Sequence, residues 1–263
     1  MNIPEGSPSV AVLVVSCDRY SDLWEPFFKC WFKYWPDCPY PVYLGTGRFA
    51  YPDSRVKSLL VGDDISYSDN LRKLLEIIDE EWVIFWVEDR FLSAKVDTDW
   101  LIRLVVTAQK ERAGCLKLIP EDPLAYRTGD AYWGVLNKRT KYRVSMTIAI
   151  WRKQTLLSIL RTGESAWELE TAGTKRSNDL DEKFLALTSQ VRKSPPIRHV
   201  HTIIKGRIMR SAIRFLENEG VRRALSKRVL QSRCSAIYVW SYQRFVRVFF
   251  FLQHWFSGSN KNN

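Results

Sequence analysis

The chain has 263 residues, of which 46% are hydrophobic and 13% aromatic, a composition that excludes a disordered chain and supports a folded core. The 40 Lys and Arg residues outnumber 29 Asp and Glu residues, which gives a formal net charge of +11. Lys205 to the C-terminus holds 12 basic and 2 acidic residues, whereas residues 1–204 hold 28 and 27. The basic excess therefore belongs to the C-terminal region.

Two features favour the cytoplasm. Five cysteines, at spacings that match no zinc motif, are typical of reduced thiols in a chain of this length. The N-terminal segment MNIPEGSPSV lacks the basic region and long apolar run of a signal peptide.

The first hundred or so residues alternate between strand and helix patterns. The β-branched run SVAVLVVS at residues 9–16 predicts a buried parallel strand, and aromatic residues at helical spacing predict a helix over 23–35 that ends before Pro36. Further strands are predicted at PVYLG, RVKSLLVG and WVIFWV, and a helix capped by Ser68 is predicted through NLRKLLEIID. This order predicts an α/β fold with a mostly parallel central sheet flanked by helices, which binds ligands at the carboxyl ends of its strands.

The pattern is less regular in the second half of the chain. The segment DTDWLIRLVVTAQKE predicts a helix, and residues 114–144 are typical of a sheet edge with loops. Another helix is predicted from near Trp151 to before Gly163. The polar segment TAGTKRSND predicts a mobile loop, and LDEKFLALTS after it predicts a helix.

The C-terminal region differs from the rest in character. RIMRSAIRFLENEGVRRALSKRVLQ places apolar residues among Arg and Lys at helical intervals, which predicts a basic amphipathic helix or a pair of helices broken at Gly220. The following SAIYVWSYQRFVRVFFFLQHWF is interrupted by Arg244 and Arg247, so it falls short of the ~18 uncharged apolar residues that span a bilayer. We expect residues 1–206 to form one domain and residues 207–263 a basic, aromatic helical tail that associates with a membrane or a partner.

Acidic and polar side chains follow two of the predicted strands. Glu88 and Asp89 end WVIFWV, and hard divalent ions prefer such oxygen ligands. Ser16, Asp18 and Tyr20 follow the first strand, where they are suited to bind a nucleoside. The alternative for Glu88 and Asp89 is an acidic pair that is merely solvated.

Three segments carry a family resemblance: VVSCDRYSDLWEPFFKCWFKYWPDCPYPVYLG, YSDNLRKLLEIIDEEWVIFWVEDRFL and YRVSMTIAIWRKQTLLSILRTGESAWELE. They resemble bacterial glycosyltransferases of the A-type (GT-A-like) fold that assemble surface polysaccharides, over roughly residues 10–206. The resemblance implies a nucleotide-sugar donor, UDP-linked, with Asp18 near its base or ribose. It also places Glu88 and Asp89 at the family's acidic metal motif. Asp97-Thr98-Asp99 has the family's usual Asp-any-Asp spacing, but helix capping explains it.

The same resemblance implies further site residues. GESAWELE is similar to the motif that supplies the catalytic base of inverting members, with Glu168 as the first choice and Glu164 and Glu170 as alternatives. Ser165 and Glu168 also fit a capping box, which is a structural explanation for Glu168. His199 and Lys205 are expected to complete the diphosphate site, and Arg72 is also expected to bind the nucleotide-sugar donor. His201, two residues after His199, would face the same side of a strand.

The combined hypothesis is a hexosyltransferase for O-antigen or capsule synthesis. The donor would be a UDP-sugar and the acceptor a lipid-linked glycan. The leaving diphosphate would be stabilised by Mn²⁺ or Mg²⁺ at Glu88 and Asp89, or by basic side chains. Inversion is the preferred outcome and retention the alternative. Its expected location is cytoplasmic, peripheral on the inner face of the plasma membrane, with the anionic membrane surface and other polysaccharide-assembly enzymes as partners.

Two rival hypotheses belong to other classes of protein. A basic chain with exposed aromatic residues can bind nucleic acid, but here the charge lies on amphipathic segments and no nucleic-acid-binding motif is present. Nucleic acid is therefore not expected as a partner. The other rival is a catalytically inactive, transferase-like scaffold.

Overall fold

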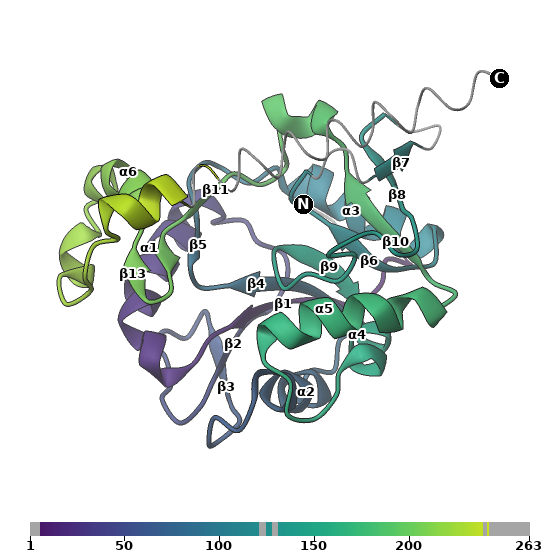
Figure 1. Cartoon of the computed structure of the whole chain (residues 1–263), viewed down its shortest axis with the longest axis horizontal. Helices are drawn as coiled ribbons and strands as arrows, with labels where there is room; N and C mark the ends of the chain where they lie inside the picture. The colour runs from purple at the N-terminus through teal and green to yellow at the C-terminus, as the bar shows by residue number, and fades with distance from the viewer. Residues whose placement is uncertain (1–5, 121–124, 128–130, 239–240, 242–263) are drawn as a thin grey trace.

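A computed structural model describes residues 6–120, 125–127, 131–238 and 241. Nine strands form the central sheet in the order β3-β2-β1-β4-β9-β6-β10-β8-β7 (Figure 1). Strands β8 and β9 run antiparallel to their neighbours, and the other seven share one direction. The strands of this sheet are β1 (Val10–Val15), β2 (Val42–Thr46), β3 (Lys57–Leu60), β4 (Trp82–Val87), β6 (Ala113–Lys117), β7 (Ala125–Arg127), β8 (Trp133–Leu136), β9 (Ala149–Arg152) and β10 (Lys183–Leu187).

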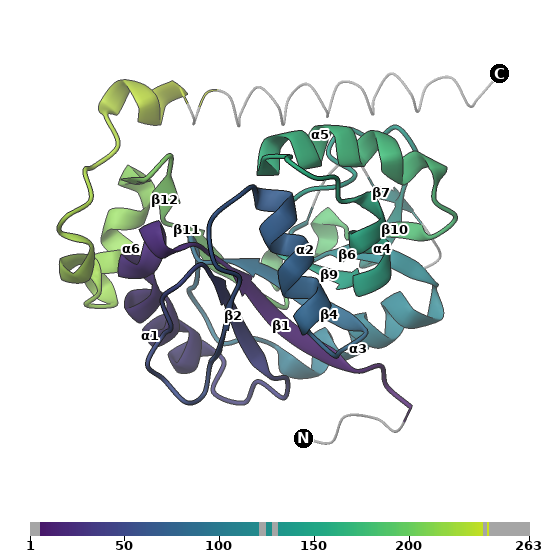
Figure 2. The same ribbon diagram turned by 90° about the horizontal axis from the view of Figure 1, so that it is seen from below.

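Helices cover both faces of the sheet (Figures 1 and 2). The α-helices are α1 (Trp24–Tyr34), α2 (Tyr67–Ile77), α3 (Thr98–Lys110), α4 (Lys153–Ile159), α5 (Ala166–Arg176) and α6 (Ile213–Asn218). Alternate residues of β1 point to opposite faces, so Val12 belongs to the hydrophobic cluster under α1 and α3, and Leu13 to the cluster under α2, α4 and α5. The fold is thus the three-layer α/β arrangement that the strand and helix pattern predicts.

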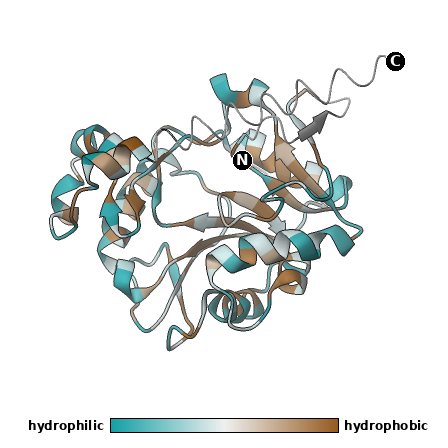
Figure 3. Cartoon of the chain, in the orientation of Figure 1, coloured by the Kyte–Doolittle hydropathy of each residue, from teal (hydrophilic) through white to brown (hydrophobic). Residues whose placement is uncertain are grey.

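The hydrophobic residues concentrate in the strands and on the inner sides of the helices (Figure 3). Aromatic rings dominate the layer beneath α1, where Trp31 meets Trp86 of β4 edge to face with ring centroids 5.0 Å apart. The helical spacing of aromatic residues in α1 therefore reflects burial, because one face of that helix supplies the core.

The cap of α2 differs from the prediction. Ser66, not Ser68, is the N-cap, and its hydroxyl accepts a hydrogen bond from the Asp69 backbone N–H. Ser68 lies inside the helix, and its buried hydroxyl donates to the backbone carbonyls of Arg161 (2.6 Å) and Glu164 (3.0 Å). Both serines are suitable residue types for an N-cap. The contacts of the Ser68 hydroxyl with Arg161 and Glu164, which are distant in sequence, go with its place inside the helix.

The prediction of a loop at TAGTKRSND is wrong, because most of this segment is helical. Helix α5 continues through Arg176 and is followed by the 3₁₀ turn η2 (Ser177–Asp179). Leu169 and Gly173 form its buried side, so the polar composition that suggested a loop is that of a largely exposed helix.

Two predicted helices contain strands instead. Trp151 belongs to β9, which lies between β4 and β6, and helix α4 starts only at Lys153. LDEKFLALTS contains β10, where Phe184 to Leu187 are buried between β6 and β8. A short continuous apolar run fits a strand buried on both faces as well as a helix, which explains both errors. Likewise, the region expected to be irregular contains the central strand β6 as well as β8.

Residues after 206 contact the same core. The hairpin of β12 (Ile203–Ile204) and β13 (Arg207–Ile208) spans the predicted domain boundary, and Leu216 and Leu225 are buried in the cluster with α1. A second small sheet pairs β5 (Arg90–Leu92) with β11 (His199–His201). The remaining short elements are the 3₁₀ helices η1 (Asp18–Leu23), η3 (Ser189–Lys193), η4 (Arg210–Ala212) and η5 (Arg222–Leu225). The division into two domains stays a prediction.

Most of the predicted membrane-surface segment, residues 235–256, lies outside the described residues, which include only 235–238 and 241 of it. Within the described part of the chain, no helix combines the length and apolarity needed to cross a membrane.

Candidate functional site

A cavity of about 1180 Å³ opens at the carboxyl edge of β1, β2, β3 and β4. The segments that follow these strands form one wall, and the start of α5 forms another. Seven carboxylates and four Lys or Arg side chains line it: Asp18, Asp63, Asp64, Glu88, Asp89, Glu168 and Glu170, with Arg19, Arg48, Arg90 and Lys205. The cavity is thus where an α/β sheet binds ligands, and its lining is predominantly acidic.

Asp18 fastens the loop after β2 to the end of β1. Its carboxylate accepts hydrogen bonds from the backbone N–H groups of Gly47 (3.1 Å), Arg48 (2.9 Å) and Phe49 (3.2 Å). A Cβ on Gly47 would come within 2.8 Å of Asp18 Oδ2, so this approach requires glycine. The predicted nucleoside contact therefore lines the cavity while also shaping the loop beside it.

Glu88 is buried at the end of β4. Burial, together with the negative charge of Asp89, raises the pKa of Glu88 to about 8, against the opposing effect of a hydrogen bond from Ser16. The Ser16 hydroxyl also accepts a hydrogen bond from Trp24 Nε1 at 2.8 Å. Near neutral pH Glu88 therefore holds a proton for much of the time, and a cation placed beside it would release that proton.

Asp89 lies among basic groups. Its Oδ2 is 3.0 Å from His201 Nε2, and its Oδ1 is 3.7 Å from Arg90 Nε. The side-chain hydroxyl and backbone N–H of Thr202 both donate to the Asp89 carbonyl, which fixes the backbone. The pairing of β5 with β11 brings His201 to this place, 112 residues along the chain from Asp89.

The donor atoms near Glu88 and Asp89 limit the kind of metal site that this acidic pair can form. Among the described residues, no group of three or more His, Cys, Asp or Glu side chains is arranged to hold a metal ion. Asp89 Oδ1 is nevertheless buried and has no hydrogen-bond partner within that part of the chain. Such an oxygen fits an ion that takes one or two carboxylates and completes its coordination with substrate phosphates and water, as Mg²⁺ commonly does.

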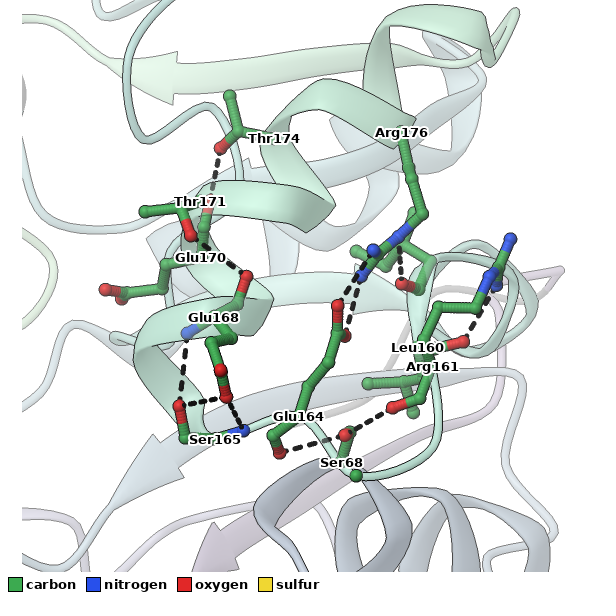
Figure 4. Close-up of polar contacts among 12 residues, drawn as sticks. Ser68, Leu160, Arg161, Glu164, Ser165, Glu168, Glu170, Thr171, Thr174 and Arg176 are labelled. Atoms are coloured by element: carbon green, nitrogen blue, oxygen red, sulfur yellow. Dashed lines mark hydrogen bonds and ion pairs between the residues drawn. The ribbon is translucent and has the colours of Figure 1, made fainter.

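The first turn of α5 forms the opposite wall, and its capping box is formed (Figure 4). The Glu168 carboxylate accepts hydrogen bonds from the Ser165 backbone N–H at 2.8 Å and hydroxyl at 2.7 Å. These two hydrogen bonds lower the pKa of Glu168. Glu168 lines the cavity, but its carboxylate already stabilises the N-terminus of α5.

The other two candidate bases differ in position (Figure 4). The Glu164 carboxylate forms a two-pronged ion pair with Arg176, at 2.7 and 2.8 Å, and is not part of the cavity lining. Glu170 lines the cavity, and its Oε1 accepts a hydrogen bond from the Met146 backbone N–H at 2.7 Å. Of the three glutamates, Glu170 is thus oriented toward the cavity without serving as a helix cap.

The C-terminal region contributes to the rim of the cavity. Lys205 lines it, next to Tyr20 from the segment after β1. Arg228 forms ion pairs with Asp22 at 2.6 Å, lies 4.5 Å from the centre of the Tyr20 ring, and donates to the Gly206 carbonyl at 3.3 Å. One arginine therefore joins the two cavity segments that follow β1 and β12.

The structure separates two predicted donor contacts from the cavity. Arg72, on α2, donates to the Leu160 carbonyl at 2.9 Å and is not in the cavity lining. His199 lines a separate hollow of about 320 Å³, with its Nε2 3.4 Å from Arg90 Nη1. Burial and the charge of Arg90 lower the pKa of His199 to about 4.

Tyr67 and Trp167 are two of the cavity residues that were not predicted from the sequence. The Tyr67 hydroxyl is buried without a hydrogen-bond partner among the described residues, and burial, with the charges of Glu170, Glu88 and Asp89, raises its pKa. Trp167 lines the cavity with 63% of its surface exposed. Two signals in the sequence could have indicated these residues. Tyr67 follows the α2 cap directly, and Trp167 lies inside the GESAWELE motif.

Comparisons with known proteins define the class of fold. No protein-family model matches the chain, and no curated protein matches it in sequence. Solved structures do match, and they confirm the predicted fold, an α/β GT-A-like architecture with a mostly parallel central sheet flanked by helices.

A mannosyltransferase from Pyrobaculum calidifontis, PcManGT, solved with GDP-Man and Mn²⁺, is similar over 77% of this chain and 59% of its own, with a TM-score of 0.52 and 14% identity. TarS from S. aureus is similar over 69% of this chain and 60% of its own, with a TM-score of 0.44 and 14% identity. The bifunctional IspDF from Campylobacter jejuni is similar over 64% of this chain and 47% of its own, at a TM-score of 0.40 and 16% identity. The matched regions thus span about half to three fifths of these neighbours' own lengths.

Proposed function

We propose that the protein is a glycosyltransferase that moves a hexose from a nucleotide diphosphate sugar to a hydroxyl group of a glycan. The observation that carries this proposal is the cavity at the carboxyl edge of the parallel strands, where acidic residues after β1 and β4 face a carboxylate on α5. The fold shared with a mannosyltransferase that binds GDP-Man supports it. A UDP-linked donor and inversion of configuration complete the proposal.

The nucleoside would lie between the ends of β1 and β3. Asp18 and the loop it holds, with Tyr20 beside them, border that part of the cavity. The fixed backbone of this loop leaves little to reorganise on binding, which is how a rigid site favours its ligand.

The diphosphate would lie at the end of β4, near Asp89, Arg90 and Lys205. Both the phosphates and the carboxylates are negative, so binding needs cationic groups there. Arg90 and Lys205 supply fixed positive charge, and Asp89 Oδ1, with Glu88, would hold a divalent ion if one takes part. Such an ion supplies charge stabilisation for the leaving diphosphate.

Glu170 is proposed as the general base, with Glu168 as the alternative. A base must reach the acceptor hydroxyl from within the cavity, and the Glu170 carboxylate lines that cavity and accepts a hydrogen bond from the Met146 backbone N–H. This carboxylate is the proposed group for the proton transfer.

The acceptor is proposed to be a lipid-linked glycan of a bacterial surface polysaccharide such as O-antigen or capsule. The +10 charge of the region from Lys205 onward supports attachment to an anionic membrane, where such an acceptor resides. The inner face of the plasma membrane is the location that this proposal requires.

A donor-hydrolysis screen tests the proposed activity. The purified protein is incubated with a panel of UDP-, GDP-, ADP- and dTDP-sugars, with and without Mn²⁺, and release of the nucleoside diphosphate is measured. We expect release from at least one donor and its loss in Asp89→Ala. The proposal fails if no donor is hydrolysed or transferred, or if Asp89→Ala and Glu170→Gln both leave turnover unchanged.

A further inference from the structure

A second hollow, of about 360 Å³, borders Glu170, and we call it the α5 pocket. One wall comes from a single face of α5 and the turn after it, and the other from the segment between β8 and β9. Its lining residues are Arg139, Lys141, Tyr142, Glu170, Thr171, Thr174, Lys175 and Asn178. Glu170, the residue proposed as the base, lines both hollows, so the α5 pocket and the main cavity are neighbours.

The α5 pocket has the opposite charge balance from the main cavity. Arg139, Lys141 and Lys175 are exposed at its edge, and Glu170 is the acidic residue of its lining. In the part of the chain that the structure describes, none of the three cations forms an ion pair, and Lys141 lies only over the Tyr142 ring, 5.1 Å from its centroid. The pocket therefore presents three cationic groups with no carboxylate bonded to them.

The backbone keeps this wall in place. Arg139 and Tyr142 both adopt left-handed conformations, with φ of 66° and 57°, which side chains other than glycine rarely take. The Arg139 backbone N–H donates to Asn178 Oδ1 at 2.7 Å, which ties the segment to the turn after α5.

An aromatic pair links the two hollows. The Tyr142 ring of the α5 pocket meets Trp167 edge to face, with centroids 6.1 Å apart. Trp167 lines the main cavity and is 63% exposed, so a broad apolar face is open between the acidic cavity and the basic pocket. Such a face suits the C–H side of a sugar ring, which stacks on aromatic rings.

We propose that the α5 pocket is an acceptor subsite that binds an anionic group of the acceptor glycan while a neighbouring sugar ring stacks on Trp167. This inference rests on the proposed function. An acidic group held at the pocket would keep the acceptor hydroxyl on the Glu170 side of the cavity, away from the acidic donor wall. The anion is a uronate carboxylate or the phosphate that links a glycan to its lipid, and both suit Arg and Lys side chains.

Matched acceptors test the proposal. Transfer is measured to a neutral alkyl hexoside, an alkyl glucuronide and a hexose joined to an alkyl phosphate, with the wild type and Lys141→Gln/Lys175→Gln. We expect the KM for an anionic acceptor to rise about tenfold in the double variant, equivalent to ~1.4 kcal/mol, and the KM for the neutral acceptor to change less than about twofold. Whichever anionic acceptor responds identifies the source of the charge.

Controls separate this proposal from the proposed function. Lys138→Gln changes an exposed lysine of the same segment that does not line the pocket, and should leave every KM unchanged. Donor hydrolysis should be equal in all variants, because the donor wall is untouched. Equal changes of KM for neutral and anionic acceptors, or none, would overturn the subsite even where donor hydrolysis shows an active transferase.

Binding measured without turnover gives an independent answer. Calorimetric titration with the alkyl glucuronide and an alkyl phosphate should show binding to the wild type and Lys138→Gln and its loss in the double variant. Equal binding to all variants overturns the subsite. So does a double variant that loses binding to anionic vesicles but keeps its acceptor KM, because the pocket would then be a membrane contact.

Discussion

At the scale of single residues, Glu88 is a cavity carboxyl group whose ionisation is strongly changed by burial. The raised pKa, about 8 compared with a usual 4.5, means that folding favours the protonated form of this carboxyl group. Its contribution to stability is therefore fully present below pH 4.5 and is lost as the pH rises toward 8. Each unit of the shift corresponds to ~1.4 kcal/mol.

We predict that Glu88→Gln stabilises the protein at pH 8 relative to the wild type by a few kcal/mol, at ~1.4 kcal/mol per pKa unit, and that most of the gain disappears at pH 5. The amide keeps the shape of the protonated acid but cannot ionise. Urea unfolding at both pH values measures the difference. Glu76→Gln, at an exposed position on α2, is the control and should show no such pH dependence. A gain of equal size at both pH values would contradict the assigned cause.

The contribution of His199 to stability depends on pH in the opposite direction. Its pKa is lowered from 6.5 to about 4 by burial and by Arg90, so its contribution to stability is present above pH 6.5 and is lost as the pH falls toward 4. We predict that His199→Gln, compared with the wild type by urea unfolding at pH 7 and pH 4.5, costs more stability at the higher pH. An equal cost at both pH values would mean that His199 ionises as freely in the folded protein as in the unfolded chain.

Variants of the three glutamates of the α5 region distinguish a catalytic role from a structural one. We predict that Glu170→Gln lowers kcat by about 10²- to 10⁴-fold, the usual contribution of a general base, with little change in melting temperature. Glu168→Gln replaces the capping carboxylate by an amide that also fits a capping box, and Glu164→Gln weakens the ion pair with Arg176, so both should lower stability slightly and keep most of the activity. Transfer assays and urea unfolding of the three variants give the result. A larger loss of kcat in Glu168→Gln than in Glu170→Gln would instead make Glu168 the base.

The sequence indicated positions at the strand ends more reliably than it distinguished these glutamates. Asp18 and Glu88 follow directly on buried apolar strands, so their placement at the cavity follows from strand direction alone. The roles of Glu164 and Glu170 depend on where α5 begins and on a partner, Arg176, in its last turn. Spacing within GESAWELE does not contain that information.

At the scale of elements, the 3₁₀ helix η1 and the hairpin β12–β13 are held together by Arg228. Its guanidinium bonds Asp22 and the Gly206 carbonyl while lying over Tyr20, and it belongs to a segment more than 200 residues away from η1. A lysine would keep the charge but not the two-pronged contact with Asp22.

We predict that Arg228→Gln raises the KM for the donor about tenfold, equivalent to ~1.4 kcal/mol, and changes kcat little, because Tyr20 and Lys205 lose their fixed positions without loss of the reacting groups. Arg228→Lys should recover part of the affinity. Lys227→Gln, the exposed neighbour, is the control. Steady-state kinetics with varied donor concentration measures the effect. A loss of kcat at unchanged KM would show that Arg228 does not position the donor site.

Buried strands rich in β-branched residues were predicted well, whereas two other buried strands were mistaken for helix. The amphipathic helices α1 and α3 and the strands β1 to β4 match their predicted positions. β9 (AIWR) and β10 (KFLAL) are also buried on both faces, so neither shows the period of two that marks a half-buried strand, and unlike β1 (VAVLVV) they contain few β-branched residues. Only their neighbours in the sheet, which the sequence does not show, distinguish them from helix.

At the scale of the whole molecule, charge is divided between two regions. The main cavity is lined by seven carboxylates, and the region from Lys205 onward carries 12 of the 40 basic residues. The first part of this region is also structural, because Ile208, Leu216 and Leu225 are buried against the core. Membrane attachment and folding are therefore expected to depend on different parts of the same C-terminal region.

Two truncations separate these roles. We predict that a chain ending at Gly206 loses its cooperative unfolding transition, because the loss of three buried side chains, each worth about 2–5 kcal/mol when truncated, is comparable to the whole stability of a typical domain. A chain ending at Tyr238 keeps every residue of that cluster and should melt close to the full-length protein. It lacks Arg244 and Arg247 with the aromatic residues around them, so its affinity for anionic vesicles should fall at least about tenfold, since each basic residue near a membrane surface contributes ~1 kcal/mol. Thermal melting and co-sedimentation with anionic and zwitterionic vesicles measure the two properties. If the chain ending at Tyr238 binds anionic vesicles as tightly as the full-length protein, the attachment site must lie among the basic residues between Lys205 and Arg233, on the same side chains that close the rim of the cavity.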